Sequence, residues 1–278
     1  MIVGFIGFGQ VSSTLSNILS SNGIQTVTVV KDRSQKTNKL AVKSDVRIID
    51  SYEALLLGSD IVISANSPAN ALNIADKYAD YMGDGIYVDL NNISPNTTYY
   101  MADLFEKPRR IVPQEESSRL NFFKKKNDVD IRNNFVDGAI IGNVSNKPPL
   151  IILSGVRANE LAILNNYGLN VKVLSKIPGD VATLKILRSL YTKGVSAVLM
   201  EAFETAKEMD LEEQLFEILS ITEGENFEEK SKSRLKNTYA NSKRKVEEMD
   251  EALEFLDEVS KGKKHIMTKA TKDKFDSY

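Results

Sequence analysis

A glycine-rich turn near the start of the chain has residue types and spacing suited to binding a pyrophosphate. An apolar run at 2–6 breaks into Gly7-Phe8-Gly9-Gln10-Val11-Ser12, and an amphipathic stretch follows. This order predicts a strand, a tight turn and a helix, so that backbone N–H groups and the positive helix end converge on one point. Ser12 stands where the dinucleotide fingerprint has its third glycine. We predict a dinucleotide site at Gly7, Phe8, Gly9, Gln10 and Val11, with a plain turn as the alternative.

The loop after the second predicted strand, 25–30, bears on the choice of cofactor. It reads Lys31-Asp32-Arg33-Ser34-Gln35-Lys36-Thr37. In dinucleotide-binding folds this loop lies beside the adenosine ribose, where an acid binds the 2′-hydroxyl of NAD and an arginine accepts the 2′-phosphate of NADP. Asp32 favours NAD, whereas Arg33, Ser34 and Lys36 form a cationic, hydroxyl-bearing cradle for a phosphate. We predict NADP, with NAD and an ordinary solvated loop as the alternatives.

Two further predicted strands, 61–65 and 86–90, end in polar turns. Ligands of such sheets lie outside the carboxyl ends of the strands. Asn66, Ser67 and Pro68 are therefore expected to face the nicotinamide half of the cofactor. Asn91 and Asn92 could hold a substrate carboxylate with neutral donors, although Asn-Asn-x-Ser-Pro is also a good turn and helix cap.

A long helical pattern begins at Gly179-Asp180 and continues to about residue 209. Helical spacing places Lys185, Arg188, Ser189 and Thr192 on one stripe, beside an apolar flank of Leu184, Leu187 and Tyr191. A polar stripe on a helix that joins two domains is costly unless it faces water, a partner or a ligand. Lys185 is thus either a candidate acid–base group or a solvated surface lysine.

The order of strands and helices predicts how these residues are positioned. Strands and helices alternate up to about residue 174, and only helical patterns follow. We predict an α/β Rossmann-like dinucleotide-binding domain at 1–176, joined by the long helix to an all-helical substrate and dimerisation domain at 177–278. The stretch 106–134 lacks periodicity and is interpreted as a surface excursion. A helix is expected to start near residue 226, but its bounds are not predicted.

The composition limits which residue types can act as acid–base groups and which classes of partner are expected. The 278 residues carry a formal net charge of −2, contain no cysteine and include one histidine, His265, in a charged tail. The near-balanced charge gives no reason to expect nucleic acid or an anionic membrane as a partner. An acid–base group would be lysine, carboxylate or tyrosine, and no metal site is predicted. No apolar run has the length of a membrane span, so a cytoplasmic location is expected.

Together these motifs resemble the β-hydroxyacid dehydrogenases, the family of 3-hydroxyisobutyrate and 6-phosphogluconate dehydrogenases. The resemblance covers most of the chain: residues 3–9 resemble the cofactor fingerprint, and Asp32-Arg33-Ser34 resembles an Asn-Arg-Thr loop that reads NADP. Residues 88–95 resemble the substrate motif Asp-x-Ser-Thr-x-x-Pro, and 135–142 resembles the strand with Asp-Ala-Pro-Val-Ser-Gly. The spacing from Gly179 to Lys185 matches that from the family's glycine to its catalytic lysine.

The resemblance implies a substrate cleft, Lys185 as general acid–base, Gly142 among the substrate-binding residues, and a homodimer. Two departures limit it: Arg188-Ser189 replaces Asn-Asn or His-Asn, and Asn91-Asn92 replaces Ser-Thr. With Ser189 beside it, Arg188 therefore predicts a substrate with an additional anionic group, or a substrate carboxylate that is bound there rather than at Asn91 and Asn92.

We expect an NADP-dependent oxidoreductase that transfers a hydride between the cofactor and a small hydroxy acid. Two alternatives stay open. One is an oxidative decarboxylating dehydrogenase of the 6-phosphogluconate type, and the other is a non-catalytic NADP-binding sensor or scaffold protein.

Overall fold

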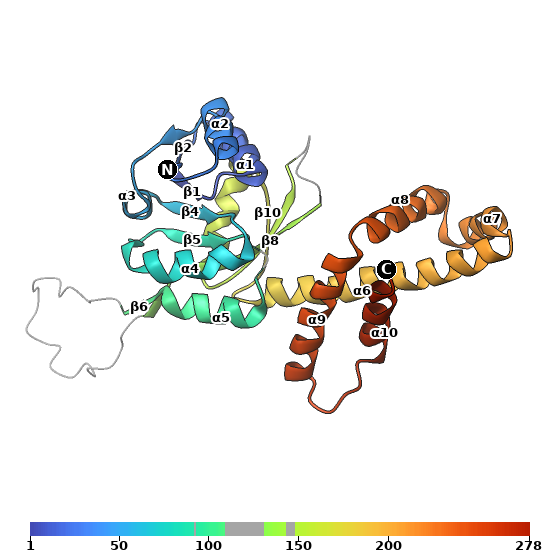
Figure 1. Cartoon of the computed structure of the whole chain (residues 1–278). Coiled ribbons are helices and arrows are strands. Elements are labelled where there is room, and N and C mark those ends of the chain that lie inside the picture. The colour runs from blue at the N-terminus through green and yellow to red at the C-terminus, as the bar shows by residue number, and fades with distance from the viewer. Residues whose placement is uncertain (92, 109–130, 143–147) are drawn as a thin grey trace, which may run out of the picture. The chain divides into compact units, whose positions relative to one another are not determined.

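The computed structural model describes residues 1–91, 93–108, 131–142 and 148–278 (Figure 1). The chain divides into two compact units, Met1–Thr183 and Leu184–Tyr278. Helix α6 (Asp180–Glu208) begins in the first unit and continues into the second. The boundary expected from the sequence, between 176 and 177, falls shortly before this helix. Within the described residues, no helix combines the length and apolar character needed to cross a membrane.

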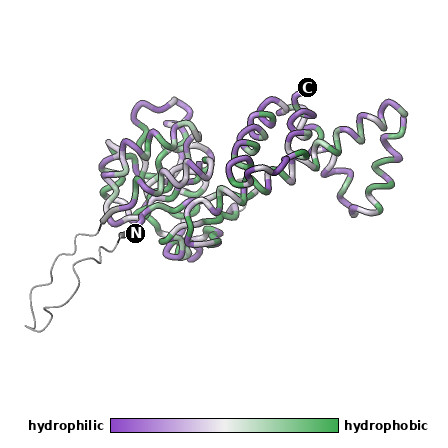
Figure 2. The backbone as a smooth tube through the Cα atoms, turned by 90° about the horizontal axis from the view of Figure 1, so that it is seen from below, coloured by the Kyte–Doolittle hydropathy of each residue, from purple (hydrophilic) through white to green (hydrophobic). Residues whose placement is uncertain are grey.

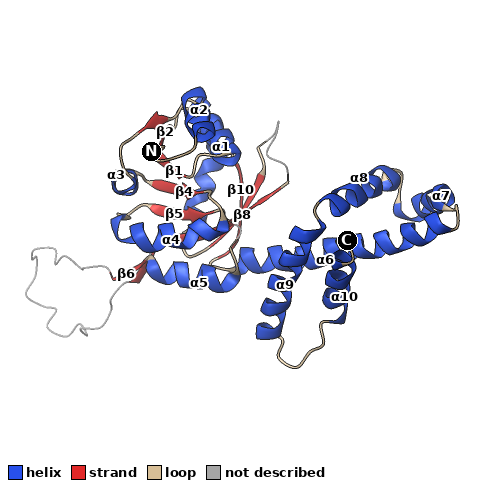
Figure 3. Cartoon of the chain, in the orientation of Figure 1, coloured by secondary structure: helices blue, strands red, loops and turns tan. Residues whose placement is uncertain are grey.

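The first unit is built on an eight-stranded sheet of order β10-β9-β8-β5-β4-β1-β2-β3 (Figure 3). All neighbouring strands are parallel except β8 and β9. The strands are β1 (Ile2–Ile6), β2 (Gln25–Thr28), β3 (Arg47–Ile48), β4 (Ile61–Ser64), β5 (Ile86–Asp89), β8 (Phe135–Ile141), β9 (Leu150–Ser154) and β10 (Asn170–Ser175). The parallel strands alternate with helices, which confirms the predicted Rossmann-like α/β fold.

Side chains along a strand point alternately to the two faces of the sheet, and here each face is buried in an apolar core of its own. Val3 and Phe5 belong to one apolar core, and Ile6 belongs to the other. The helical segments of this unit are α1 (Gln10–Ser21), α2 (Gln35–Lys43), α3 (Tyr52–Gly58), α4 (Pro68–Tyr78), η1 (Ala79–Tyr81), α5 (Pro95–Leu104) and η2 (Ala158–Tyr167). Near-continuous apolar strands are what such a two-sided sheet requires, and the sequence provides them.

The ends of the stretch 106–134 correct the prediction of an excursion without regular structure. Strand β6 (Glu106–Pro108) pairs antiparallel with β7 (Ile131–Asn133). Strands of three residues are too short to give a recognisable alternation, which is why the sequence did not reveal them. The middle of this stretch, 109–130, lies outside the described residues.

The second unit is all-helical. After α6 it contains α7 (Glu212–Glu223), α8 (Phe227–Ala240), α9 (Ser242–Val259) and α10 (Ile266–Asp276). Its cores are small: one surrounds Met200 and Phe275, and the other stacks Phe203 on Phe216, with ring centroids 3.9 Å apart. Hydrophobic and hydrophilic positions alternate along α6 (Figure 2). Helix α8 starts where the sequence indicated a helix, near residue 226, but its bounds could not be predicted because its buried positions are Ser231 and Thr238 rather than apolar residues.

Candidate active site

The glycine turn is closed on one side and open on the other. Gly7 has a φ of +81°, and a Cβ there would lie 2.6 Å from the Ala65 carbonyl oxygen and against the Asn66 side chain. The buried Ser12 hydroxyl donates a 2.6 Å hydrogen bond to the Gly7 carbonyl, so serine at the third fingerprint position ties the helix to the turn. Around Gly9, by contrast, no atom of the described residues lies within 4 Å of a Cβ position. Position 7 thus requires glycine because of its positive φ and its close neighbours. The glycine at position 9 leaves space that a ligand can fill.

Helix α1 begins at this open position without a side-chain cap on Gly9. Its first N–H groups are therefore placed to bind the phosphates of a dinucleotide. Phe8 is buried and packs edge-on against Phe5, with ring centroids 6.1 Å apart, so it can contribute only its backbone to a ligand. Gln10 is exposed, and Val11 is half-buried against the core. The turn thus combines open space at Gly9 with uncapped helix N–H groups, which are the features that a diphosphate requires.

The loop after β2 is fixed by its own backbone. Asp32 adopts a left-handed conformation with a φ of +59°, and the Arg33 N–H donates to the Val30 carbonyl at 3.1 Å. The Asn38 amide donates to the carbonyls of Arg33 and Ser34, each at 3.1 Å. Ser34 caps α2, since its hydroxyl accepts a hydrogen bond from the backbone of the helix's first turn. The loop therefore presents Arg33 in a defined place.

The Arg33 side chain has a partner that the sequence gave no reason to expect. Its Nε and Nη2 donate to the hydroxyl of Tyr52, the first residue of α3, at 3.1 Å and 2.6 Å. Lys36 is exposed in the first turn of α2.

The carboxyl ends of the central strands form one row across the sheet. Strand register pairs Ile6 with Ser64, Ser64 with Asp89, and Asp89 with Asp137. The glycine turn, the turn after β4 and the turn after β5 all leave the sheet from this row. Residues that are distant in the sequence therefore share one edge, as expected for a site outside the strand ends.

A hydrogen-bond network occupies this edge. Asn91 is buried, its amide donates to Ser64 Oγ at 2.9 Å and to the Asp89 carboxylate, and its oxygen accepts from the Asn66 backbone N–H. Asn66 in turn donates to the Ile6 carbonyl at 3.0 Å. Both amide hydrogens of Asn91 are thus engaged at the ends of β4 and β5, and its oxygen holds the backbone of the turn after β4.

The remaining predicted residues of these turns are placed in part. Ser67 is exposed at the start of α4, and Pro68 is the first residue of that helix. Asn92 lies outside the described residues. Gly142 follows β8 with a φ of +99° and is exposed.

Tyr87, on β5, is buried next to this edge. Burial and the Asp89 carboxylate raise the pKa of the Tyr87 phenol. The phenol therefore stays protonated at neutral pH, which excludes it as a base.

Helix α6 starts at the same edge. The buried Asp137 carboxylate accepts a hydrogen bond from the Ala182 N–H at 3.0 Å, and Ser154 Oγ accepts one from the Val181 N–H at 3.2 Å. An acid from β8 and a hydroxyl from β9 thus cap the helix, which satisfies free N–H groups and the helix dipole. Sequence reasoning did not assign this role, although a single acid within the apolar strand Phe-Val-Asp-Gly-Ala was a signal for it.

Lys185 follows Ala182 by three residues in this helix and is half-buried, with its Nζ shielded from solvent. Arg188 is exposed. The Ser189 hydroxyl accepts a hydrogen bond from Lys193 Nζ, which also pairs with the Glu248 carboxylate at 2.5 Å. Ser189 is therefore linked to α9 within the second unit.

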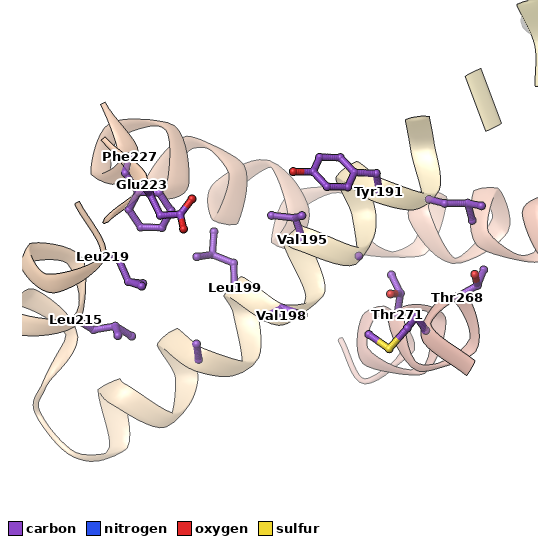
Figure 4. A pocket seen from close by; sticks show the side chains of 14 residues that line it. Tyr191, Val195, Val198, Leu199, Leu215, Leu219, Glu223, Phe227, Thr268 and Thr271 are labelled. Carbon is purple, nitrogen blue, oxygen red and sulfur yellow. The ribbon is translucent and has the colours of Figure 1, made fainter. Parts of the chain in front are cut away.

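An apolar groove of about 730 Å³ lies on the second unit, between α6, α7, the start of α8 and α10 (Figure 4). Its lining is Leu190, Tyr191, Gly194, Val195, Val198, Leu199, Ala202, Leu215, Leu219, Glu223, Phe227, Met267, Thr268 and Thr271. Glu223 is the one ionisable acid in this lining. Such a surface is suited to an apolar partner rather than to acid–base chemistry.

Comparisons with known proteins agree with this architecture. A family model described as an NADP oxidoreductase, coenzyme F420-dependent, matches residues 2–93, and a domain model of unknown function matches residues 206–278. An uncharacterised 28.5-kDa protein of Methanothermus fervidus is 41% identical over 275 residues, which cover 99% of this chain and 98% of that protein. A solved structure of a conserved protein, reported as structurally similar to 3-hydroxyacid dehydrogenases, is 37% identical with a TM-score of 0.79, over 100% of this chain and 96% of the other.

The chain belongs to the β-hydroxyacid dehydrogenase family. It is accordingly a nicotinamide-dependent dehydrogenase or reductase of the β-hydroxyacid dehydrogenase type. The fold also matches Mycobacterium tuberculosis 3-hydroxyisobutyrate dehydrogenase, solved with L-serine, at a TM-score of 0.72 and 13% identity over 99% of this chain and 92% of that one. The roles of the individual residues of this β-hydroxyacid dehydrogenase remain predictions.

Proposed function

We propose that the protein transfers a hydride between NADP and a small hydroxy acid, with Lys185 as the general acid–base. One observation carries the proposal: α6 is capped by Asp137, which stands in the same sheet row as the glycine turn. Lys185 and Ala182 lie on one side of this helix, because residues three apart are neighbours on a helix surface. Lys185 therefore follows the capped residue Ala182 by about one helical turn along α6.

In this proposal the cofactor transfers the hydride and the protein transfers the proton. The nicotinamide cofactor accepts or supplies the hydride. In oxidation, the neutral Lys185 amine takes the proton of the substrate hydroxyl, and in reduction its ammonium form returns that proton. The chain has no cysteine, and its single histidine is remote in sequence from the strand-end turns. Lysine, carboxylate and tyrosine are the residue types left for the role, and we assign it to Lys185.

We assign substrate recognition to residues that precede Lys185 in the sequence and to residues that follow it. Asn91 supports the turn that carries Asn66, and Asn92 and Gly142 are assigned to substrate binding from the sequence. Arg188 and Ser189, one helical turn after Lys185, would bind an additional anionic group of the substrate. A guanidinium supplies a permanent charge and a bidentate donor pair for a carboxylate or phosphate.

We also propose that the protein is a homodimer in which a second copy covers the apolar groove of the helical unit. Val198 is 60% exposed and Tyr191 is 73% exposed, and both line the groove. Exposed apolar surface of this extent is typical of an interface. A second copy is the partner that is always present at matching concentration.

The test uses the full chain, NADP⁺ and a panel of small hydroxy acids, and follows NADPH formation. Lys185→Met should lower turnover about 10³-fold while NADPH binding is retained, because a general acid–base contributes on the order of 10²–10⁴. Lys207→Met, an exposed lysine of the same helix, is the matched control and should behave as the parent. Full activity of Lys185→Met would contradict the assignment.

Two further outcomes distinguish the alternatives. Release of carbon dioxide in step with NADPH would favour the decarboxylating reaction. Tight NADPH binding with no turnover across the whole panel would favour the non-catalytic sensor or scaffold.

A further inference from the structure

Tyr52 holds the guanidinium of Arg33 through a single oxygen. The Tyr52 hydroxyl accepts hydrogen bonds from Nε at 3.1 Å and from Nη2 at 2.6 Å, and Arg33 Cζ lies 5.8 Å from the centre of the tyrosine ring. Two donors on one acceptor fix the plane of the guanidinium as well as its position. Within the part of the chain that the structure describes, the Nη1 hydrogens and the second Nη2 hydrogen have no acceptor, so they can bind one from a ligand.

Both partners are held independently of this contact. Arg33 is anchored through its backbone to Val30 and Asn38. Tyr52 opens α3, whose cap is the Ser51 hydroxyl, accepting from the Ala54 N–H at 3.2 Å. The Tyr52 ring also packs against Tyr78, with ring centroids 5.3 Å apart. The pair is therefore formed before any ligand arrives, and preorganised donors cost less conformational entropy on binding.

The chemistry of the hydroxyl adds a second contribution. An oxygen that already accepts two N–H donors has its own hydrogen free to donate. Guanidinium and phenol together then offer charge-assisted and neutral donors to a phosphate dianion. A ribose 2′-hydroxyl carries no charge and gains far less from the same arrangement.

We propose that Tyr52 is a positioning and specificity-determining residue: it orients the Arg33 guanidinium toward the 2′-phosphate of NADP, and its hydroxyl donates a hydrogen bond to that phosphate. The inference rests on the proposed use of NADP and names a residue that the sequence did not single out. Tyr52 acts on the adenosine end of the cofactor and takes no part in hydride transfer.

The experiment compares Tyr52→Phe with Tyr81→Phe in the full chain. Phenylalanine keeps the ring and its packing and removes only the hydroxyl. Tyr81 belongs to the same aromatic group, 6.4 Å from Tyr78 by ring centroids, and its exposed hydroxyl serves as the control. Binding of NADPH, NADH, adenosine 2′,5′-bisphosphate and 5′-AMP is measured by fluorescence and calorimetry, and thermal melts check folding.

Tyr52→Phe should weaken NADPH and the bisphosphate about tenfold, with NADH and 5′-AMP changed less than about twofold, because hydrogen bonds to charged groups are the ones removed. Tyr81→Phe should match the parent for all four ligands. In an Arg33→Ala background, Tyr52→Phe should lose most of its effect, since the two residues act together.

Each other result is decisive. If the parent prefers NADPH and Tyr52→Phe retains that preference, the role of Tyr52 is refuted while the NADP assignment stands. An equal loss for NADH also refutes it, because the change is then general. If the parent binds NADPH and NADH equally, the NADP assignment fails first and the proposal about Tyr52 fails with it.

Discussion

The carboxylate of Asp137, on β8, accepts a hydrogen bond of 3.0 Å from the backbone N–H of Ala182 in the first turn of α6. This bond ties the long helix to the sheet row from which the glycine turn departs. Asp137 is 2% exposed, so the bond is shielded from competing water. The attachment of the first turn of α6 to the sheet therefore depends on this buried acid.

Removing that acid should destabilise the protein. Asp137→Ala leaves a buried helix N–H without its acceptor, and we expect the free energy of unfolding to fall by about 2–4 kcal/mol. Urea denaturation of the full chain measures this. Asp103→Ala, which removes an exposed acid of α5, is the control and should stay within about 0.5 kcal/mol of the parent. Equal stability of the two variants would show that Asp137 does not anchor the helix.

Gly7→Ala should impair both folding and cofactor binding. An added Cβ meets the Ala65 carbonyl oxygen at 2.6 Å, and the φ of +81° is unfavourable for alanine. We expect a loss of about 2 kcal/mol in stability and at least a tenfold loss in dinucleotide affinity. Gly83→Ala is the control, since a Cβ there has no neighbour within 4 Å among the described residues. Unchanged NADPH affinity in Gly7→Ala would argue against a dinucleotide at this turn.

Arg33→Ala should narrow the selectivity between the two cofactors. The parent is expected to bind NADPH at least tenfold more tightly than NADH, because in the proposed site Arg33 pairs with the additional phosphate. The variant should bind the two with similar affinity, mainly by losing NADPH. Parallel fluorescence titrations of both cofactors measure this, and an unaltered ratio in the variant would remove Arg33 from the site.

Lys245 should make stability depend on pH. Burial and the neighbouring Lys193 ammonium lower the pKa of Lys245, whose Nζ donates to Thr238 Oγ1 at 2.8 Å. Between the lowered folded pKa and the ordinary unfolded value, the unfolded state binds more protons, so this group makes the folded state gain stability as pH rises.

Lys245→Met should therefore be more stable than the parent at pH 7, and the advantage should shrink as the pH approaches 10. Urea denaturation at both pH values measures the difference. Lys243→Met, at an exposed position of the same helix, should show neither effect. A destabilised Lys245→Met variant at pH 7 would show that the buried ammonium is compensated by its surroundings.

Val198→Glu should convert the proposed dimer into a monomer. A carboxylate in the apolar groove would lose its hydration on association, at a cost that the interface cannot offset. Light scattering coupled to gel filtration measures the mass of the parent and the variant. Val156→Glu, at an exposed valine of the first unit, is the control and should leave the mass unchanged. A monomeric parent would refute the dimer.

Local sequence patterns determined much of this fold. The apolar run of β1, the glycines after it and the start of α1 are contiguous, so their order alone predicts strand, turn and helix. The same holds for α6, whose start at Asp180 and end at Glu208 agree with a pattern from Gly179 to about residue 209. The alternation of strands and helices gave the fold class for the same reason.

Only the tertiary structure decided which side chains meet. Arg33 and Tyr52 are 19 residues apart, and Asp137 and Ala182 are 45 apart, so no local pattern relates them. Asn91 turned out to support the turn of Asn66 because neighbouring strands bring both residues to one edge. A hydrogen bond depends on the distance and direction between two groups in space. For residues far apart in the sequence, these are set by the register of the strands in the folded sheet.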